Sequence, residues 1–177
     1  MSPQELVAKG FSPELTVFLT SMVPVIELRG ALPVAINLFK IPWYEAFVIS
    51  FIGNILPVPL ILLFLKPVTD LLCKISIFGK FFEWLFKRTR KKSEIIEKYK
   101  ELGLLIFVAI PLPGTGAWTG ALLAYLMALD FKRSIIFISL GVFIAGVIVS
   151  SLCLIGWVGA IIALIGITVF TLIRIFG

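Results

Sequence analysis

Two long apolar segments of this chain are each interrupted near the middle by proline and glycine. The first segment, residues 11–39, is broken at residues 23–30, and the second, residues 102–129, is broken at residues 110–116. A lipid bilayer offers no water to hydrogen-bond an irregular backbone, so such a break survives only where protein buries it or where it lines a polar cavity. If the chain lies in a membrane, the paired breaks therefore predict a substrate site.

The composition indicates a membrane environment. Hydrophobic residues make up 60% of the 177 residues and charged residues only 15%, and the mean hydropathy is +1.12. One aqueous core could not hide so much apolar surface. We therefore expect an all-α polytopic membrane protein with a single integral membrane domain over residues 1–177. Residues 1–10 hold one basic residue and no small-residue cleavage site follows, so no removable signal peptide is expected.

Segment length separates full spans from shorter helices. A membrane-spanning helix needs about 20 apolar residues, and three segments meet or approach this length: residues 43–65, 134–155 and 157–174. The pieces that flank the breaks would each extend only about 14 to 20 Å as helices, so none crosses alone. Each broken segment is therefore either one kinked crossing or a re-entrant hairpin that returns to its own side.

The distribution of basic residues favours the hairpins. Ten of the sixteen Lys and Arg residues lie between residues 66 and 100, and short basic loops prefer the cytoplasm. The amphipathic linker 67–101 is therefore predicted to be cytoplasmic and to contact anionic lipid headgroups of the inner membrane. With hairpins, Lys132, Arg133 and Arg174 also lie on the cytoplasmic side, whereas with kinked crossings all three lie outside.

The two halves of the chain also resemble each other. Gly30-Ala31-Leu32 follows the first break and Gly120-Ala121-Leu122 follows the second, and each leads through a short helix to a polar turn and a long apolar helix. Residues 1–66 and 102–155 therefore read as two repeats. One full span separates the hairpins, so they enter from opposite faces, as in the inverted repeats of secondary transporters. Because the match is short, chance similarity among apolar residues is the alternative.

Glu27 and Arg29 are the ionisable residues predicted to lie within the membrane. A charge at mid-bilayer costs about 2.5–3.5 kcal/mol, so such residues pair or mark a transport pathway. Glu27 is a candidate proton-coupled carboxylate and Arg29 a fixed positive charge; alternatively, the two neutralise each other and seal the hairpin tip. Helix ends and backbone amides at the breaks could also hold an anionic group. The expected substrate-binding or coupling residues are Glu27, Arg29, Gly30, Pro111, Pro113, Gly114, Thr115 and Gly116.

The sequence offers little for other chemistry. It has no histidine, and Cys73 and Cys153 are far apart, unlike the ligands of a zinc site. We therefore expect no metal, no cofactor and no enzymatic activity. The net charge of +6 and the basic run 87–92 are explained by the preference of Lys and Arg for cytoplasmic loops. Nucleic-acid binding is therefore not expected. The expected partner is a membrane lipid or an amphipathic small molecule, and homo-oligomerisation is left open.

Three motifs resemble a known family. Residues 27–33, residues 110–116 and the stretch 127–134 are similar to those of the small multidrug export protein family, over roughly residues 16–155. That family looks like a distant branch of the DedA (VTT-domain) superfamily. The resemblance implies two re-entrant hairpins in inverted repeat and movement of lipids between leaflets, with Glu27 as the acidic residue of the first hairpin. DedA proteins carry arginines around the proline of the second hairpin, where this chain has Leu112, Gly114 and Thr115.

Three functions are compatible with these features. The first is a DedA-type transporter, flippase or scramblase for an anionic or zwitterionic lipid-like substrate, with proton coupling through Glu27 as an option. The second is proton-coupled export of cationic drugs, in which Glu27 alone binds the cation. The third is a non-transporting membrane assembly protein. Arg29 beside Glu27 favours the first function over the second.

Overall fold

The computed structural model describes residues 3–8, 10–72, 94–112, 114–156, 165–166 and 168–169. Within these ranges all regular structure is helical, so the all-helical prediction is confirmed there. The elements are α1 (Pro3–Ala8), α2 (Pro13–Met22), α3 (Glu27–Pro33), η1 (Val34–Leu38), α4 (Trp43–Ile55), α5 (Pro57–Leu72), α7 (Glu94–Ala109), α8 (Ala117–Leu126) and α9 (Phe131–Leu154). All except η1, which is π-helical, are α-helices.

Two of the described helical stretches are long and apolar enough to cross a membrane. One is Trp43–Leu65, formed by α4 and the first part of α5, and the other is α9. They coincide with the predicted spans 43–65 and 134–155, but α9 begins three residues earlier than expected. It does so because Asp130 caps it, its carboxylate accepting hydrogen bonds from the amides of Lys132 and Arg133.

Parts of two predictions fall outside the described residues. The linker 67–101 is described only at its ends, where α5 continues to Leu72 and α7 begins at Glu94. The middle of this predicted amphipathic linker lies outside the described ranges. The predicted extra span 157–174 also lies almost entirely outside them.

The first broken segment folds back on itself. Pro24 forces the preceding Val23 into an extended conformation, with φ −73° and ψ 130°, and this ends α2. The structure narrows the break to residues 23–26, after which α3 packs against α2. Pro33 lies inside the same helical run, and the backbone beyond it is π-helical until Leu38. The short helix predicted after the first break is thus continuous but changes its hydrogen-bonding pattern at Pro33.

The second broken segment also reverses direction and is held by close helix packing. α7 ends at Ala109, before Pro111, and α8 begins after Gly116. Both helices pack against α9. A Cβ on Gly141 would approach the side chain of Val108 and the backbone of Leu105 too closely. Glycine is therefore needed where α9 crosses α7, as is common between helices in membranes.

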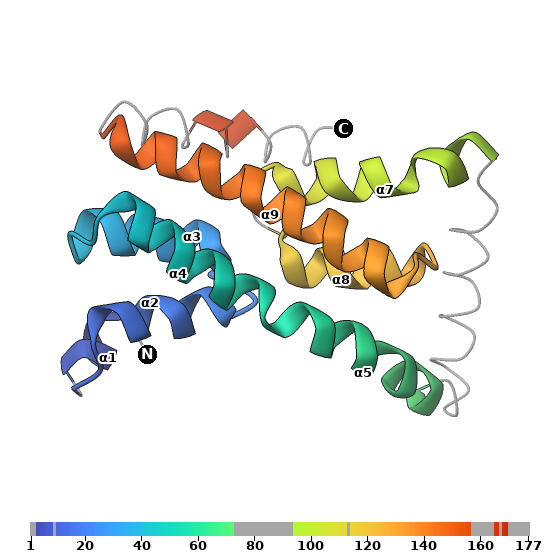
Figure 1. Ribbon diagram of the computed structural model, residues 1–177, viewed down its shortest axis with the longest axis horizontal. Coiled ribbons are helices and arrows are strands. Elements are labelled where there is room, and N and C mark those ends of the chain that lie inside the picture. The colour runs from blue at the N-terminus through green and yellow to red at the C-terminus, as the bar shows by residue number, and fades with distance from the viewer. Residues whose placement is uncertain are drawn as a thin grey trace.

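Figure 1 shows how the two broken segments lie relative to each other. The turn between η1 and α4 is at one end of the bundle, and the turn between α8 and α9 is at the opposite end. The breaks lie between these turns, near the middle of the molecule, and side chains from each half bond to the other half there. The fold thus brings together two irregular segments, and the hydrogen bonds between the halves join residues 79 to 96 positions apart in sequence.

Candidate functional site

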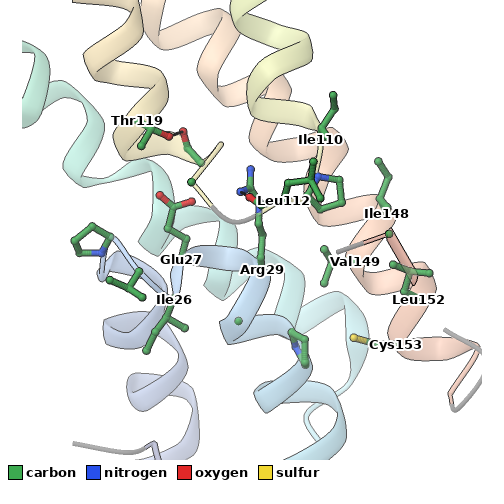
Figure 2. A pocket seen from close by; sticks show the side chains of 18 of the residues that line it. Ile26, Glu27, Arg29, Ile110, Leu112, Thr119, Ile148, Val149, Leu152 and Cys153 are labelled. Carbon is green, nitrogen blue, oxygen red and sulfur yellow. Dashed lines mark hydrogen bonds between the residues drawn. The ribbon is translucent and has the colours of Figure 1, made fainter. Parts of the chain in front are cut away.

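The two breaks and α9 line an open cavity of about 810 Å³ (Figure 2). The first half contributes Pro24, Val25, Ile26, Glu27, Arg29, Gly30, Pro33 and Asn37. The second break and the start of α8 contribute Ile110, Pro111, Leu112, Gly114, Gly116 and Thr119, and the C-terminal part of α9 contributes Ile148, Val149, Leu152 and Cys153. Most of these side chains are apolar, and the charged ones are Glu27 and Arg29.

Glu27 connects the first half to the start of α8. Its side chain is buried, with 5% of its surface exposed, and its carboxylate accepts hydrogen bonds from the amides of Ala117 and Trp118, both at 3.3 Å. These amides belong to the first turn of α8, where backbone N–H groups have no partner within the helix and where the helix dipole favours a negative charge. The carboxylate therefore caps a helix of the other half.

Two backbone features allow Glu27 to reach this position. Glu27 has φ +51°, a left-handed conformation that is uncommon for residues other than glycine. Gly116 lies against the carboxylate, and a Cβ at this position would overlap the carboxylate atoms. The surrounding structure thus holds Glu27 in a strained backbone conformation, which is a feature that clusters at functional sites.

Arg29 makes the complementary contact with the end of α7. Its guanidinium donates to the carbonyls of Val108 at 3.0 Å, Thr115 at 2.9 Å and Leu112. Val108 lies in the last turn of α7, where carbonyls have no partner within the helix and where a positive charge is favoured. Three of the five N–H groups of Arg29 are used in this way.

A third contact links the two halves. The indole Nε1 of Trp118 donates to the carbonyl of Met22, the last residue of α2, at 3.1 Å. Glu27, Arg29 and Trp118 each satisfy a helix end that belongs to the other half of the chain. These three sets of hydrogen bonds are called the break contacts below.

The structure does not pair Glu27 with Arg29 directly. Among the described residues, the ion pair within 4.0 Å is the one between Arg133 and Glu101 at the surface. Each of the two cavity charges is instead offset by a helix end and by backbone groups. The two charges still interact electrostatically, so the interpretation that they neutralise each other stays open, and the structure adds a cross-connection between the halves.

The structure brings most of the predicted site residues to one place. Glu27, Arg29 and Gly30 from the first half and Pro111, Gly114 and Gly116 from the second all line the cavity. Thr115 acts through its carbonyl, which Arg29 contacts, and through its hydroxyl, which donates to the carbonyls of Ile110 and Leu112. Pro113 lies outside the described residues.

Several cavity residues are missed by the sequence analysis. It assigns no role to Asn37, considers Cys153 only as an unsuitable zinc ligand, and assigns no part of α9 to the site, yet all three line the cavity. Figure 2 shows Ile148, Val149, Leu152 and Cys153 on α9, on the side of the cavity away from Glu27. One sequence feature could have indicated Asn37: it follows Pro33 by four residues within one helical run, so the two lie on the same face of the helix. Apolar residues of α9 carry no comparable signal.

The described residues include no group of three or more His, Cys, Asp or Glu side chains that could hold a metal ion. The expectations of no metal and no cofactor stay predictions. The arrangement is suited to binding a small molecule. It combines an apolar cavity of drug-like size with one carboxylate and one guanidinium.

One comparison with known proteins identifies a family. The model described as "Putative small multi-drug export protein" matches residues 27–148, from Glu27 at the first break to Ile148 in the cavity wall on α9. No curated protein and no solved structure matches the chain. The expected link to the DedA superfamily stays a prediction.

Proposed function

Because this chain belongs to the small multi-drug export protein family, we propose that it exports amphipathic small molecules and binds them in the cavity between its two breaks. The family and the two apolar helices mark it as a membrane protein with a role in transport. The cavity carries the proposal: its volume of about 810 Å³ lies within the 300–1,000 Å³ typical of small-molecule sites.

The proposed membrane arrangement is that of two re-entrant hairpins. In it, α2 and α3 enter from one face and α7 and α8 from the other, so that the breaks meet near the bilayer midplane in an inverted repeat. Support comes from the positions of the two turns at opposite ends of the bundle (Figure 1). The break contacts satisfy backbone groups that lipid could not. The basic linker would then face the cytoplasm of a cell with the protein in its inner membrane.

The contacts of the two charges favour a cationic or neutral substrate over an anionic one. Arg29 is engaged with three carbonyls at short or ordinary distances, which compensates its charge. Glu27 accepts two amides at 3.3 Å, which is long for a hydrogen bond, and its carboxylate has further lone pairs available. On this argument the first expectation, an anionic or zwitterionic lipid-like substrate attracted by Arg29, is the weaker of the two transport functions.

We propose transport without a chemical reaction on the substrate. An amphipathic cation would place its apolar part against the α9 wall and its charge beside Glu27. Release would need the break contacts to open on one side, because they join the two halves at the cavity.

Transport by reconstituted protein tests this proposal. Proteoliposomes containing the full chain should move tetraphenylphosphonium across the membrane, and Glu27→Gln should abolish most of this flux because a neutral amide does not attract the cation. Glu101→Gln is the matched control, since Glu101 pairs with Arg133 away from the cavity. Equal flux in the wild type and in Glu27→Gln would contradict the proposal. Flipping of labelled anionic phospholipid without tetraphenylphosphonium flux would favour the lipid-transport function instead.

A further inference from the structure

The helix that begins at Glu27 changes type before it ends. Pro33 has no amide hydrogen and interrupts the α-helical pattern, and beyond it the amide of Phe39 bonds to the carbonyl of Val34 at 3.0 Å, an i to i+5 bond. The amide of Ile41 bonds to the carbonyl of Ala35, also at 3.0 Å. Such π-helical turns rotate side chains relative to an α-helix and are frequent at functional sites.

Asn37 is the polar side chain that this π-helical turn presents to the cavity. It is exposed and lines the cavity, as does Cys153 on α9. Asn37 is ten residues beyond Glu27 in one continuous helical run, so the two lie about 15 Å apart along the helix. The cavity therefore has a second polar end, remote from Glu27 and Arg29.

The wall between the two polar ends is apolar. Ile148, Val149 and Leu152 of α9 line it, together with Ile110 and Leu112 of the second break (Figure 2). The complementary ligand has a charged group, an apolar middle part and a hydrogen-bonding group at the other end. A carboxamide both donates and accepts hydrogen bonds, so it accommodates a hydroxyl, a carbonyl or an amide on such a ligand.

We propose that Asn37 determines substrate specificity by hydrogen-bonding the polar far end of an elongated amphipathic substrate whose charged end lies at Glu27. This inference rests on the proposed function and deepens it by naming the substrate class: molecules with two polar ends joined by an apolar chain. Cys153 lines the same cavity and can serve as a chemical reporter for this contact.

The test compares two amphiphiles that differ only at the far end. Decyltrimethylammonium has an apolar terminus and ω-hydroxydecyltrimethylammonium has a hydroxyl there. The dissociation constants of both are measured for the full chain in lipid nanodiscs, and their ratio is compared between the wild type and Asn37→Leu. Each amphiphile partitions into the lipid to the same extent whichever protein variant is present. This partitioning therefore cancels when the ratios of the wild type and the variant are compared.

We expect Asn37→Leu to shift the ratio against the hydroxylated amphiphile by about two- to tenfold, the value of one neutral hydrogen bond. Leu38→Ala, a change at the neighbouring position of η1 that does not line the cavity, should leave the ratio unchanged. An unchanged ratio in Asn37→Leu would overturn the inference while leaving the proposed function intact. If the wild type bound neither amphiphile, the proposed function and this inference would both fall.

A second measurement does not require a variant of Asn37. With Cys73 replaced by alanine, N-ethylmaleimide reports on Cys153. Saturating hydroxylated amphiphile should slow Cys153 labelling more than the decyl compound does, because its terminus is held at Asn37 in the part of the cavity that Cys153 also lines. Equal labelling rates with the two amphiphiles would overturn the proposed contact.

Discussion

Replacing Arg29 by methionine should destabilise the whole fold, not only the cavity. Methionine keeps much of the length of the side chain but donates no hydrogen bond. The three acceptor carbonyls then differ in what remains to them. The carbonyl of Leu112 keeps the hydroxyl and the amide of Thr115 as donors. Among the described contacts outside regular helix bonding, the carbonyls of Val108 and Thr115 have Arg29 alone.

The size of the effect follows from these two carbonyls. Each buried carbonyl left without a partner costs about 1–3 kcal/mol, or about 2–6 kcal/mol for both. Removing a partly buried guanidinium recovers part of the free energy spent in desolvating it. We therefore expect the free energy of unfolding to fall by about 2–4 kcal/mol. The free energy of unfolding of Arg29→Lys should lie between those of the wild type and Arg29→Met. Its ammonium keeps the charge but lacks the forked guanidinium that reaches several carbonyls.

Equilibrium unfolding in mixed micelles, followed by tryptophan fluorescence, measures this change. Arg133→Met is the matched control, because the Arg133 side chain is 66% exposed and bonds only at the surface to Glu101, so little change is expected there. If Arg29→Met altered the free energy of unfolding by less than about 0.5 kcal/mol, the range of ordinary surface substitutions, the capping role assigned to Arg29 would be refuted.

Two further predictions concern the same region and its orientation in the membrane. Gly116→Ala should displace the Glu27 carboxylate and lower both stability and tetraphenylphosphonium flux, whereas Gly103→Ala, where an added Cβ meets nothing within 4 Å, should be tolerated or slightly stabilising; the thermal midpoints and the flux of the two variants decide this. Single cysteines replacing Lys40 and Asp130 should react with a membrane-impermeant maleimide from opposite faces, and labelling from the same face would contradict the hairpins.

The sequence predicts the features that local chemistry determines. Long apolar runs predict the two described spans because only helix length and hydropathy are needed. Pro24 and Pro111 predict the breaks because proline acts on its own residue and on the one before it. The N-terminus of α9 was not predicted correctly. The Asp130 cap extends the helix into residues 131–133, which the sequence analysis assigned to a polar turn.

The partners of Glu27 and Arg29 could not be predicted in the same way. The amides that Glu27 binds are 90 and 91 residues away, and the carbonyls that Arg29 binds are 79 to 86 residues away. Two charges two residues apart naturally suggest a pair, whereas the fold directs them to different helices. Backbone groups look alike at every position of a sequence, so only the tertiary arrangement shows which ones lack partners.

Asn37 and the α9 wall were missed for a similar reason. An asparagine near the end of an apolar helix resembles many polar residues close to a turn, and its exposure to the cavity depends on the change of helix type after Pro33. The wall residues on α9 are apolar in an apolar helix. Their common role follows only from the packing of α3 against α9.

The break contacts have a consequence for how the protein is made. A ribosome completes Glu27 and Arg29 long before it has synthesised the helix ends that they complete. During that interval the nascent N-terminal half carries an acid and a base without their final partners. Exposing these unpaired charges to lipid would cost free energy. We therefore expect these two side chains to stay in contact with water or with another protein until the C-terminal half has been synthesised. The two halves would then assemble together, late in synthesis.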